Sequence, residues 1–227
     1  MCGRFAFHSP HATVAQLFAL VESTPPFAPS WNLAPTQPVP VVRAGSDGER
    51  ALVPLRWGLV PAWAKDPAIG QRLINARAET LADKPAFRSA FRRRRCLVLA
   101  DGWYEWRAEA HGKQPYFVHA ASGEPFGMAG LWESWRAPDG GAALESCVIV
   151  TRPASAAIRE IHERMPALIA TAGHAAWLAP GGEPAELAAL LAGDHGFALA
   201  AHPVSRRVNH PGNNGPELVA PVAGEIA

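Results

Sequence analysis

The second residue of the chain carries the groups for a reaction that other positions do not offer. Cys2 follows the initiator methionine, and its side chain is small enough for that methionine to be removed, which would leave an α-amine and a thiol on adjacent carbons. With an α-amine pKa of about 7.7–8.0, roughly a tenth of the amine is neutral at pH 7. A neutral amine attacks an aldehyde to form a Schiff base, and addition of the thiol would then close a thiazolidine ring. Taken alone, Cys2 is better explained as an incidental small residue.

The residues around this cysteine and in a later segment suit an anionic substrate. Gly3 allows another backbone or a ligand to approach closely, and Arg4 presents a planar fork of donors that matches a phosphate group. In residues 74–79 (INARAE), polar residues alternate with small or apolar ones, so Asn75 and Arg77 would share one face of a strand. Asn75 could instead complete a turn, and Arg77 could form a surface ion pair.

Two more segments hold groups that transfer protons. In residues 101–106 (DGWYEW), Glu105 stands among three aromatic residues, and partial burial there would raise its pKa and equip it to shuttle protons. In residues 161–166 (IHERMP), His162 stands where a predicted helix meets a strand, with Arg164 two residues on. Glu105 could instead pair with a core arginine, and His162 could cap a helix C-terminus. Together with the second-residue cysteine, these groups predict a reactive site.

The composition is that of a globular protein from a reducing compartment. The chain has 227 residues, of which 48% are hydrophobic and 18% charged, and its formal net charge is +1, which favours one domain and argues neither for nor against nucleic acid. Only three residues are lysine, so arginine dominates the positive charge. That bias suits phosphate binding, although a GC-rich genome would produce it through codon usage.

Three cysteines are too few and too sparse for a disulfide framework. Cys96 and Cys147 lie in apolar runs, CLVLA and CVIV, and are expected to be buried strand residues. The N-terminus has no signal-peptide pattern, and no apolar run approaches the length of a membrane span. These features favour a cytoplasmic protein without a membrane partner.

Hydrophobic patterning predicts strands in the middle of the chain and helices at its margins. We expect a single α+β domain over residues 1–227, with a mixed sheet or open barrel-like core and peripheral helices. Residues 211–227 have little periodicity and are expected to form an irregular tail. Strands are predicted at residues 39–43, 51–57, 96–100, 103–107, 116–120, 126–131 and 146–151, and helices at residues 11–21, 85–94, 155–161 and 184–191.

Several long motifs resemble one family. MCGRFA, WNLAPTQ, WGLVPAW, INARAET, FRRRRCLVLADGWYEW, IHERMP and a later HPVS occur in this order between residue 1 and about residue 205. Together they resemble the SRAP family (SOS response-associated peptidase domain proteins). The resemblance covers nearly the whole domain.

The resemblance implies an abasic-site shield that binds single-stranded DNA and forms a thiazolidine with the ring-opened sugar. Cys2 would be the crosslinking nucleophile, and the same site would assist the loss of Met1. Asn75 would position the N-terminus and the sugar, and Glu105 would assist ring opening and proton transfer. His162 would bind the opened sugar hydroxyl and help reversal. The resemblance implies no cofactor or metal, a monomer, and a cytoplasmic protein that joins the nucleoid during DNA damage.

The resemblance also implies a set of DNA contacts. Arg4, Arg77 and Arg164 would hold flanking phosphates, with Arg88 as a weaker candidate. Trp63 would stack on a base or wedge the strand; some relatives carry a second tryptophan after it, but this chain has Ala64, which leaves a preference for duplex junctions in doubt. The run of arginines at 92–95 is expected to be mostly a solvated helix face that adds nonspecific attraction.

Two other functions fit the same N-terminus. An N-terminal-nucleophile amidohydrolase, such as a glutamine amidotransferase domain, also begins Met-Cys-Gly, but its other motifs are not found in the sequence. A single-strand-binding module without a covalent step would bind abasic and intact strands alike. Ammonia release from glutamine identifies the first, and the lack of a heat-stable adduct identifies the second.

Overall fold

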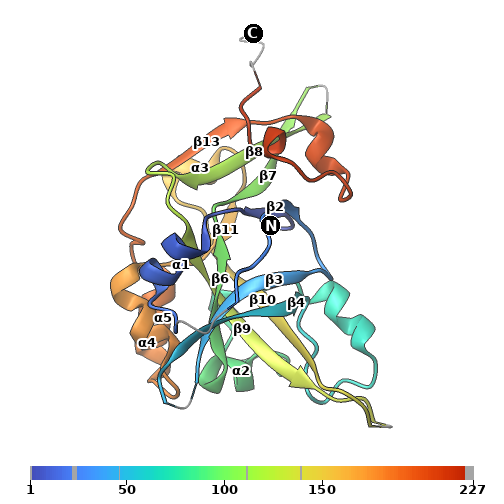
Figure 1. Cartoon of the computed structure of the whole chain (residues 1–227), viewed down its shortest axis with the longest axis vertical. Helices are drawn as coiled ribbons and strands as arrows, with labels where there is room; N and C mark the ends of the chain where they lie inside the picture. Colours follow the sequence, from blue (N-terminus) through green and yellow to red (C-terminus); the bar gives the residue numbers. More distant parts are fainter. Residues whose placement is uncertain (1, 22–24, 46, 111, 139, 223–227) are drawn as a thin grey trace.

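The computed structural model describes residues 2–21, 25–45, 47–110, 112–138 and 140–222. Two sheets lie one above the other along the long axis, with β7, β8 and β13 in the upper sheet and β3, β4, β6, β9 and β10 in the lower (Figure 1). The N-terminal segment and β2 lie at the level where the two sheets meet. The expected α+β fold with a barrel-like core is confirmed.

The lower sheet contains a closed barrel. Its strands follow the order β10-β4-β3-β6-β9, and an antiparallel ladder between β9 and β10, from Leu144↔Trp135 to Ile149↔Gly130, closes the ring. Closure pairs strand edges that would otherwise be open to other chains. The barrel strands are β3 (Pro38–Ala44), β4 (Arg50–Trp57), β6 (Arg95–Ala100), β9 (Phe126–Trp135) and β10 (Leu144–Pro153).

The upper sheet has the order β13-β8-β7-β1-β2. Three shorter strands extend the lower sheet, because β5 and β11 pair with β10 and β12 pairs with β9. The upper strands are β1 (Phe5–Phe7), β2 (Ser30–Leu33), β7 (Gly102–Glu109), β8 (Gly112–Ala120) and β13 (Leu199–Pro203). The short strands are β5 (Asn75–Arg77), β11 (Arg164–Pro166) and β12 (Leu168–Ile169).

Continuous apolar runs form the centre of the barrel. Every residue of β6 is buried, because this strand has neighbours on both edges and side chains packed on both faces. Cys96 and Cys147 have no exposed surface, which confirms that they are buried strand residues. Gly130 on β9 is required by this packing, since a Cβ there would lie 2.9 Å from the Cys96 sulfur.

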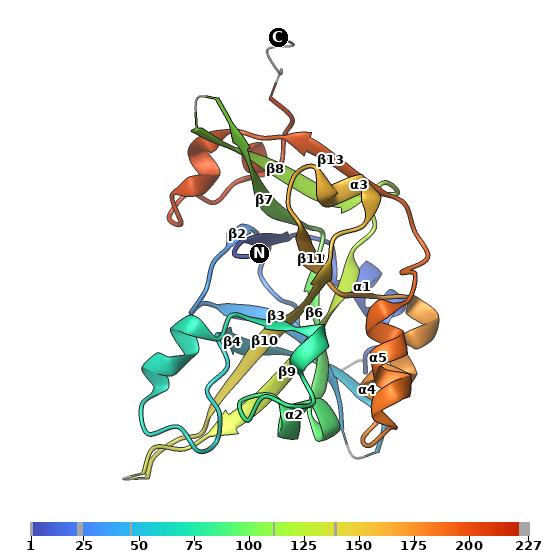
Figure 2. The ribbon, with the colours of Figure 1, turned by 180° about the vertical axis from the view of Figure 1, so that it is seen from behind.

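Helices lie at the periphery, and α4 packs beside α5 on one flank (Figures 1 and 2). The predicted helix over residues 11–21 ends at Phe18, because Ala19 adopts a left-handed φ of 50°. Within the described residues, no helix combines the length and apolar character that a membrane span needs. The α-helices are α1 (His11–Phe18), α2 (Arg88–Arg93), α3 (Ala156–Arg159), α4 (His174–Leu178) and α5 (Pro184–Ala192); 3-10 turns are η1 (Pro67–Arg72), η2 (Ala78–Thr80), η3 (Thr171–Gly173), η4 (Arg206–Asn209) and η5 (Pro216–Leu218).

The expectation of one solvated helix face over the arginine run is wrong for its second half. The helix ends at Arg93, and Arg94 forms an ion pair with Glu133, with Nε 2.7 Å from Oε1. Arg95 belongs to β6 and is buried, and its guanidinium donates to the carbonyl oxygens of Phe91, Trp177, Ala179 and Gly181. Buried carbonyls beyond a helix end need donors, and Arg95 supplies them.

The segment beyond residue 210 is irregular but docked on the upper sheet. Leu218 in η5 is fully buried, and the Asn214 side-chain oxygen accepts from the backbone N–H of Trp31 on β2 at 2.7 Å. Residues 211–222 therefore contribute to the wall beside the N-terminal strands, while 223–227 lie outside the described residues.

Candidate functional site

The N-terminal segment is inserted at the junction of the two sheets. Cys2 is completely buried and belongs to the main hydrophobic core. The backbone N–H of Tyr104 on β7 donates to the Arg4 carbonyl at 2.9 Å, and Phe5 packs edge-on against Trp57 of the barrel with ring centroids 5.2 Å apart. The position of the cysteine is thus determined by contacts with both sheets.

Asn75 binds the cysteine backbone directly. It lies on β5, which pairs in parallel with β10, and its side-chain N–H donates to the Cys2 carbonyl at 2.7 Å. The Asn75 side-chain oxygen is buried and has no hydrogen-bond partner among the described residues. A buried polar atom without a partner is costly, so this oxygen is an acceptor available to a substrate N–H or O–H.

Glu105 is a buried carboxyl group that interacts electrostatically with the Cys2 thiol. It lies on β7 with 1% of its surface exposed, and burial raises its pKa to about 7. Burial first, and the Glu105 carboxylate second, raise the pKa of the Cys2 thiol well above its ordinary value. The site therefore combines a neutral thiol with a carboxyl group that gains and loses a proton near pH 7.

His162 is fixed by the backbone of the next strand. His162 Nδ1 lies 2.9 Å from the Arg164 backbone nitrogen and 3.1 Å from the Arg164 carbonyl oxygen, so the backbone of that residue holds the ring. Burial lowers the pKa of the half-buried imidazole, which favours its neutral form. β11, which begins at Arg164, and β5 both pair with β10. His162 therefore lies just before a strand that shares its partner with the strand of Asn75 and Arg77.

The Arg164 side chain holds these segments together. Its two Nη atoms bind both carboxylate oxygens of Glu79, and Nη2 also donates to the Thr151 carbonyl at 2.7 Å. Bidentate pairs of this kind have strict geometry. Glu79 was not predicted as a site residue, although it is the last residue of the INARAE motif.

Arg4 is likewise bound within the protein. Its Nη1 donates to the Asn32 side-chain oxygen at 2.8 Å and to the Val208 carbonyl at 2.7 Å. Asn32, buried on β2, also donates to the carbonyls of His210 and Asn213. Asn32 was missed as well, and its only sequence signal is its place in the WNLAPTQ motif.

Comparison with known proteins identifies the family to which this chain belongs. The family model described as SOS response associated peptidase (SRAP) matches residues 1–211. The chain belongs to the SRAP family. It is 39% identical to the abasic site processing protein YoqW of Bacillus subtilis, over 96% of this chain and 99% of that protein. It is 34% identical to the abasic site processing protein YedK of Escherichia coli, over 98% of this chain and all of that protein.

Solved structures share this SRAP fold. A protein from Bacteroides thetaiotaomicron superposes with a TM-score of 0.84 at 24% identity and covers 98% of this chain and 100% of that chain. A phage-related protein from Bordetella bronchiseptica gives a TM-score of 0.71 at 28% identity, over 90% of this chain and 95% of that chain.

The remaining predicted DNA contacts of this SRAP protein lie outside the buried centre. Arg77 is exposed at the end of β5, directly beyond Asn75. Trp63 has 61% of its surface exposed in the loop after β4. Its neighbour Ala64 is buried, and the Ala64 carbonyl accepts from the Trp135 indole N–H at 2.7 Å. Arg88 lies on α2, which both views place at the lower end of the molecule, away from the N-terminus (Figures 1 and 2).

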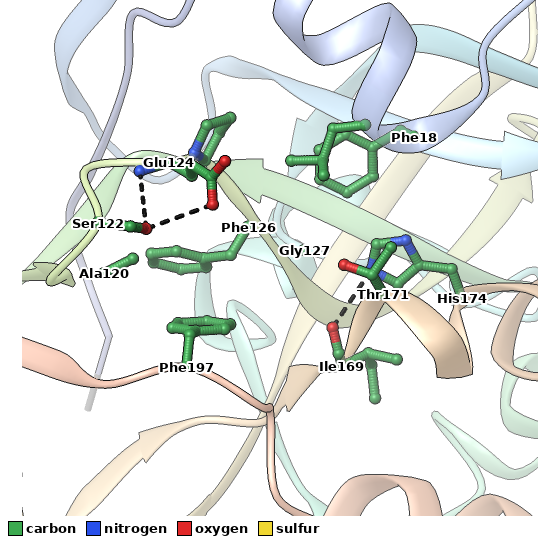
Figure 3. Close-up of a pocket in the computed structure, with 12 residues that line it drawn as sticks. Phe18, Ala120, Ser122, Glu124, Phe126, Gly127, Ile169, Thr171, His174 and Phe197 are labelled. Carbon is green, nitrogen blue, oxygen red and sulfur yellow. Dashed lines mark hydrogen bonds between the residues drawn. The ribbon is translucent and has the colours of Figure 1, made fainter.

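Figure 3 shows a separate, small pocket of this SRAP protein. It has a volume of about 60 Å³ between α1, α4 and the start of β9, which admits a few water molecules rather than a nucleotide. His174 stacks on Phe18 there, with ring centroids 5.1 Å apart, and burial lowers the pKa of His174 to about 4. Among the described residues, no group of three or more His, Cys, Asp or Glu side chains is placed to hold a metal ion.

The hydrogen bond from Asn75 gives a first prediction. Asn75→Asp keeps the size of the side chain but sets a carboxylate oxygen against the Cys2 carbonyl, whereas Asn75→Ala only removes the donor. A lost hydrogen bond costs about 1 kcal/mol, and the repulsion adds to that cost. We expect the rate of reaction with an aldehyde substrate to fall in both variants, and further in the aspartate variant, in a quenched-flow assay. Equal rates in all three proteins would contradict a positioning role for Asn75.

Proposed function

We propose that this protein processes abasic sites by covalent capture of the ring-opened sugar in single-stranded DNA. Its relatives are named abasic site processing proteins. The observation that carries the proposal is the position of Cys2, whose carbonyl is bound by Asn75 at 2.7 Å and whose thiol is influenced by the Glu105 carboxylate. An N-terminal cysteine held in this way places an amine and a thiol at one point beside a proton donor and acceptor.

The covalent reaction requires loss of Met1 and then two bond-forming steps. Hydrolysis of the Met1–Cys2 peptide bond, assisted by the site itself or by an aminopeptidase, consumes one water and frees the Cys2 amine. The amine attacks the sugar aldehyde, and the carbinolamine loses one water to give an imine. The thiol sulfur then adds to the imine carbon and its proton moves to nitrogen, which closes the thiazolidine without a further leaving group.

Three side chains have distinct roles in this proposal. Glu105, with a pKa of about 7, takes a proton from the attacking amine and returns one to the departing hydroxyl. The unpartnered oxygen of Asn75 accepts from the carbinolamine or from a sugar hydroxyl. His162 forms a hydrogen bond with the opened sugar hydroxyl and serves the reverse reaction.

The noncovalent contacts are assigned to exposed groups. Arg77 binds a phosphate next to the captured sugar, and Trp63 stacks on a base. Arg4 and Arg164 contact phosphates only in addition to their internal hydrogen bonds, so their main effect is to brace the site. Because phosphate contacts dominate such binding, affinity for intact single strands falls as salt rises.

Intact mass spectrometry tests the proposal. The protein is mixed with a single-stranded oligonucleotide that carries one abasic site. We expect a species with the mass of the protein without Met1 plus the oligonucleotide, minus one water. A tetrahydrofuran analogue of the abasic site has no aldehyde and should give no adduct. Noncovalent binding without the adduct would leave a single-strand-binding module, and ammonia release from glutamine would indicate an amidohydrolase.

A further inference from the structure

A hollow of about 610 Å³ lies between α2 and the loop that leads into α5. Arg88, Arg92 and Arg93 line it from the helix side, and residues 181–184 line it from the loop side. The three arginines are exposed. Among the described residues none of the three forms an ion pair, although Glu183 lies at the edge of the same hollow.

The two walls of the hollow are bound to each other. The buried Arg95, two residues beyond the helix, donates to the Phe91 carbonyl at 2.7 Å and to the Gly181 carbonyl at 2.5 Å. The loop is therefore held against the end of α2 in the free protein. On the helix, the Ser89 hydroxyl accepts from Arg93 Nη2 at 2.9 Å, which orients one of the three guanidinium groups that line the hollow.

One continuous segment leads from the site to this hollow. It begins at Asn75, passes the exposed cations Arg77 and Lys84, and reaches Arg88 on α2. In Figure 2 this turquoise-to-green part of the chain runs from the middle of the molecule down to α2. A strand that leaves the site along this segment meets the exposed cations Arg77, Lys84 and Arg88, as well as the exposed carboxylates of Glu79 and Asp83.

We propose that the α2 hollow is a second phosphate-binding surface, which holds the backbone of the same DNA strand beyond the nucleotides at Cys2. Guanidinium groups match phosphate oxygens. Several of them in a row bind a polyanion strongly, because binding releases the counterions that surround it. Glu183 weakens the attraction for phosphate, but the three arginines outnumber it and leave the lining of the hollow with an excess of positive charge. This inference rests on the proposed function, because it concerns the path of the strand that is captured there.

The test compares strand lengths in the double variant Arg92→Ala/Arg93→Ala. Noncovalent affinity is measured against salt for intact single strands of about 6 and about 30 nucleotides. Each lost phosphate contact lowers the salt slope on a single strand by about 0.7. We expect the slope of the variant to be smaller by about 1.4 on the long strand and unchanged on the short one. Crosslinking of a short abasic strand should keep the parent rate, which also shows that the variant is folded.

The matched control is Arg136→Ala/Arg159→Ala, which removes the same charge from two exposed arginines outside the hollow. This control should keep the parent slope on both strands. The proposal is overturned if the α2 variant keeps the full slope on the long strand, or if the control loses as much. Failure of the proposed function is a different result, namely no adduct from the parent protein, and leaves the length-dependent binding to be measured as before.

Discussion

Cys2→Ala is expected to abolish the heat-stable adduct while leaving a transient imine. Once Met1 is removed, alanine still offers an α-amine, which attacks the aldehyde, but there is no thiol to close the ring. Asn75 binds the backbone carbonyl of residue 2, so the position of the amine is maintained. On a denaturing gel of abasic oligonucleotide, borohydride should trap the imine of the variant, and without reductant no band should survive heating.

The complementary variant keeps the thiol and displaces the amine. One residue that is not removed is placed before Cys2, so that the sulfur alone can attack and gives only a reversible hemithioacetal. We expect no heat-stable band. A simple thiol nucleophile predicts the opposite order, with the extended protein active and the alanine variant inactive. The raised pKa of the Cys2 thiol favours an amine that acts first, because little thiolate is present near pH 7.

Cys147→Ala is the matched control for these variants. This cysteine is as buried as Cys2 and burial raises the pKa of its thiol as well, but it lies in the barrel strand β10. Its loss should lower stability and leave the adduct intact. A heat-stable band from the extended protein would overturn the thiazolidine mechanism, whatever the behaviour of this control.

The barrel strands could be predicted from the sequence because their signals are local. The apolar runs CLVLA and CVIV, the second of them rich in β-branched residues, appear in β6 and β10. The strands β1, β5 and β11 have only three residues each. Strands of that length exist because a neighbour pairs with them, so the 2-residue period that marks a strand has no room to appear.

The sequence offers candidate residue types for the site but not the connections between them. Cys2, Asn75, Glu105 and His162 stand out because amine, amide, carboxyl and imidazole groups suit imine chemistry. That Arg164 would bind Glu79 depends on pairs 85 residues apart, which only the fold determines. The same holds for Arg4 and Asn32: a guanidinium that suits phosphate also suits buried oxygens, and the sequence does not distinguish them.

Glu105→Gln is expected to slow crosslinking and to stabilise the protein at alkaline pH. Gln keeps the shape and the hydrogen-bonding groups but cannot exchange a proton, so the rate should fall about 10²- to 10⁴-fold. The parent rate should bend near pH 7, where Glu105 titrates, and the variant rate should lack that bend. Stopped assays across pH 5–9 (a range of about 2 units on each side of the expected pKa) measure both.

The stability effect follows from the same pKa. The pKa of Glu105 is about 7 in the folded protein against an ordinary 4.5, so between these values the folded state binds more protons than the unfolded state. The free energy of unfolding of the parent therefore decreases as pH rises from 4.5 to 7, by about 3 kcal/mol in total, and the penalty stays constant above pH 7. Gln carries no charge to bury, so urea unfolding at pH 8 should show a more stable variant, whereas at pH 4 the two proteins should be similar. A variant that crosslinks at the parent rate would show that Glu105 does not transfer the proton. A variant that gains no stability at pH 8 would show that the buried Glu105 carboxylate does not destabilise the folded state.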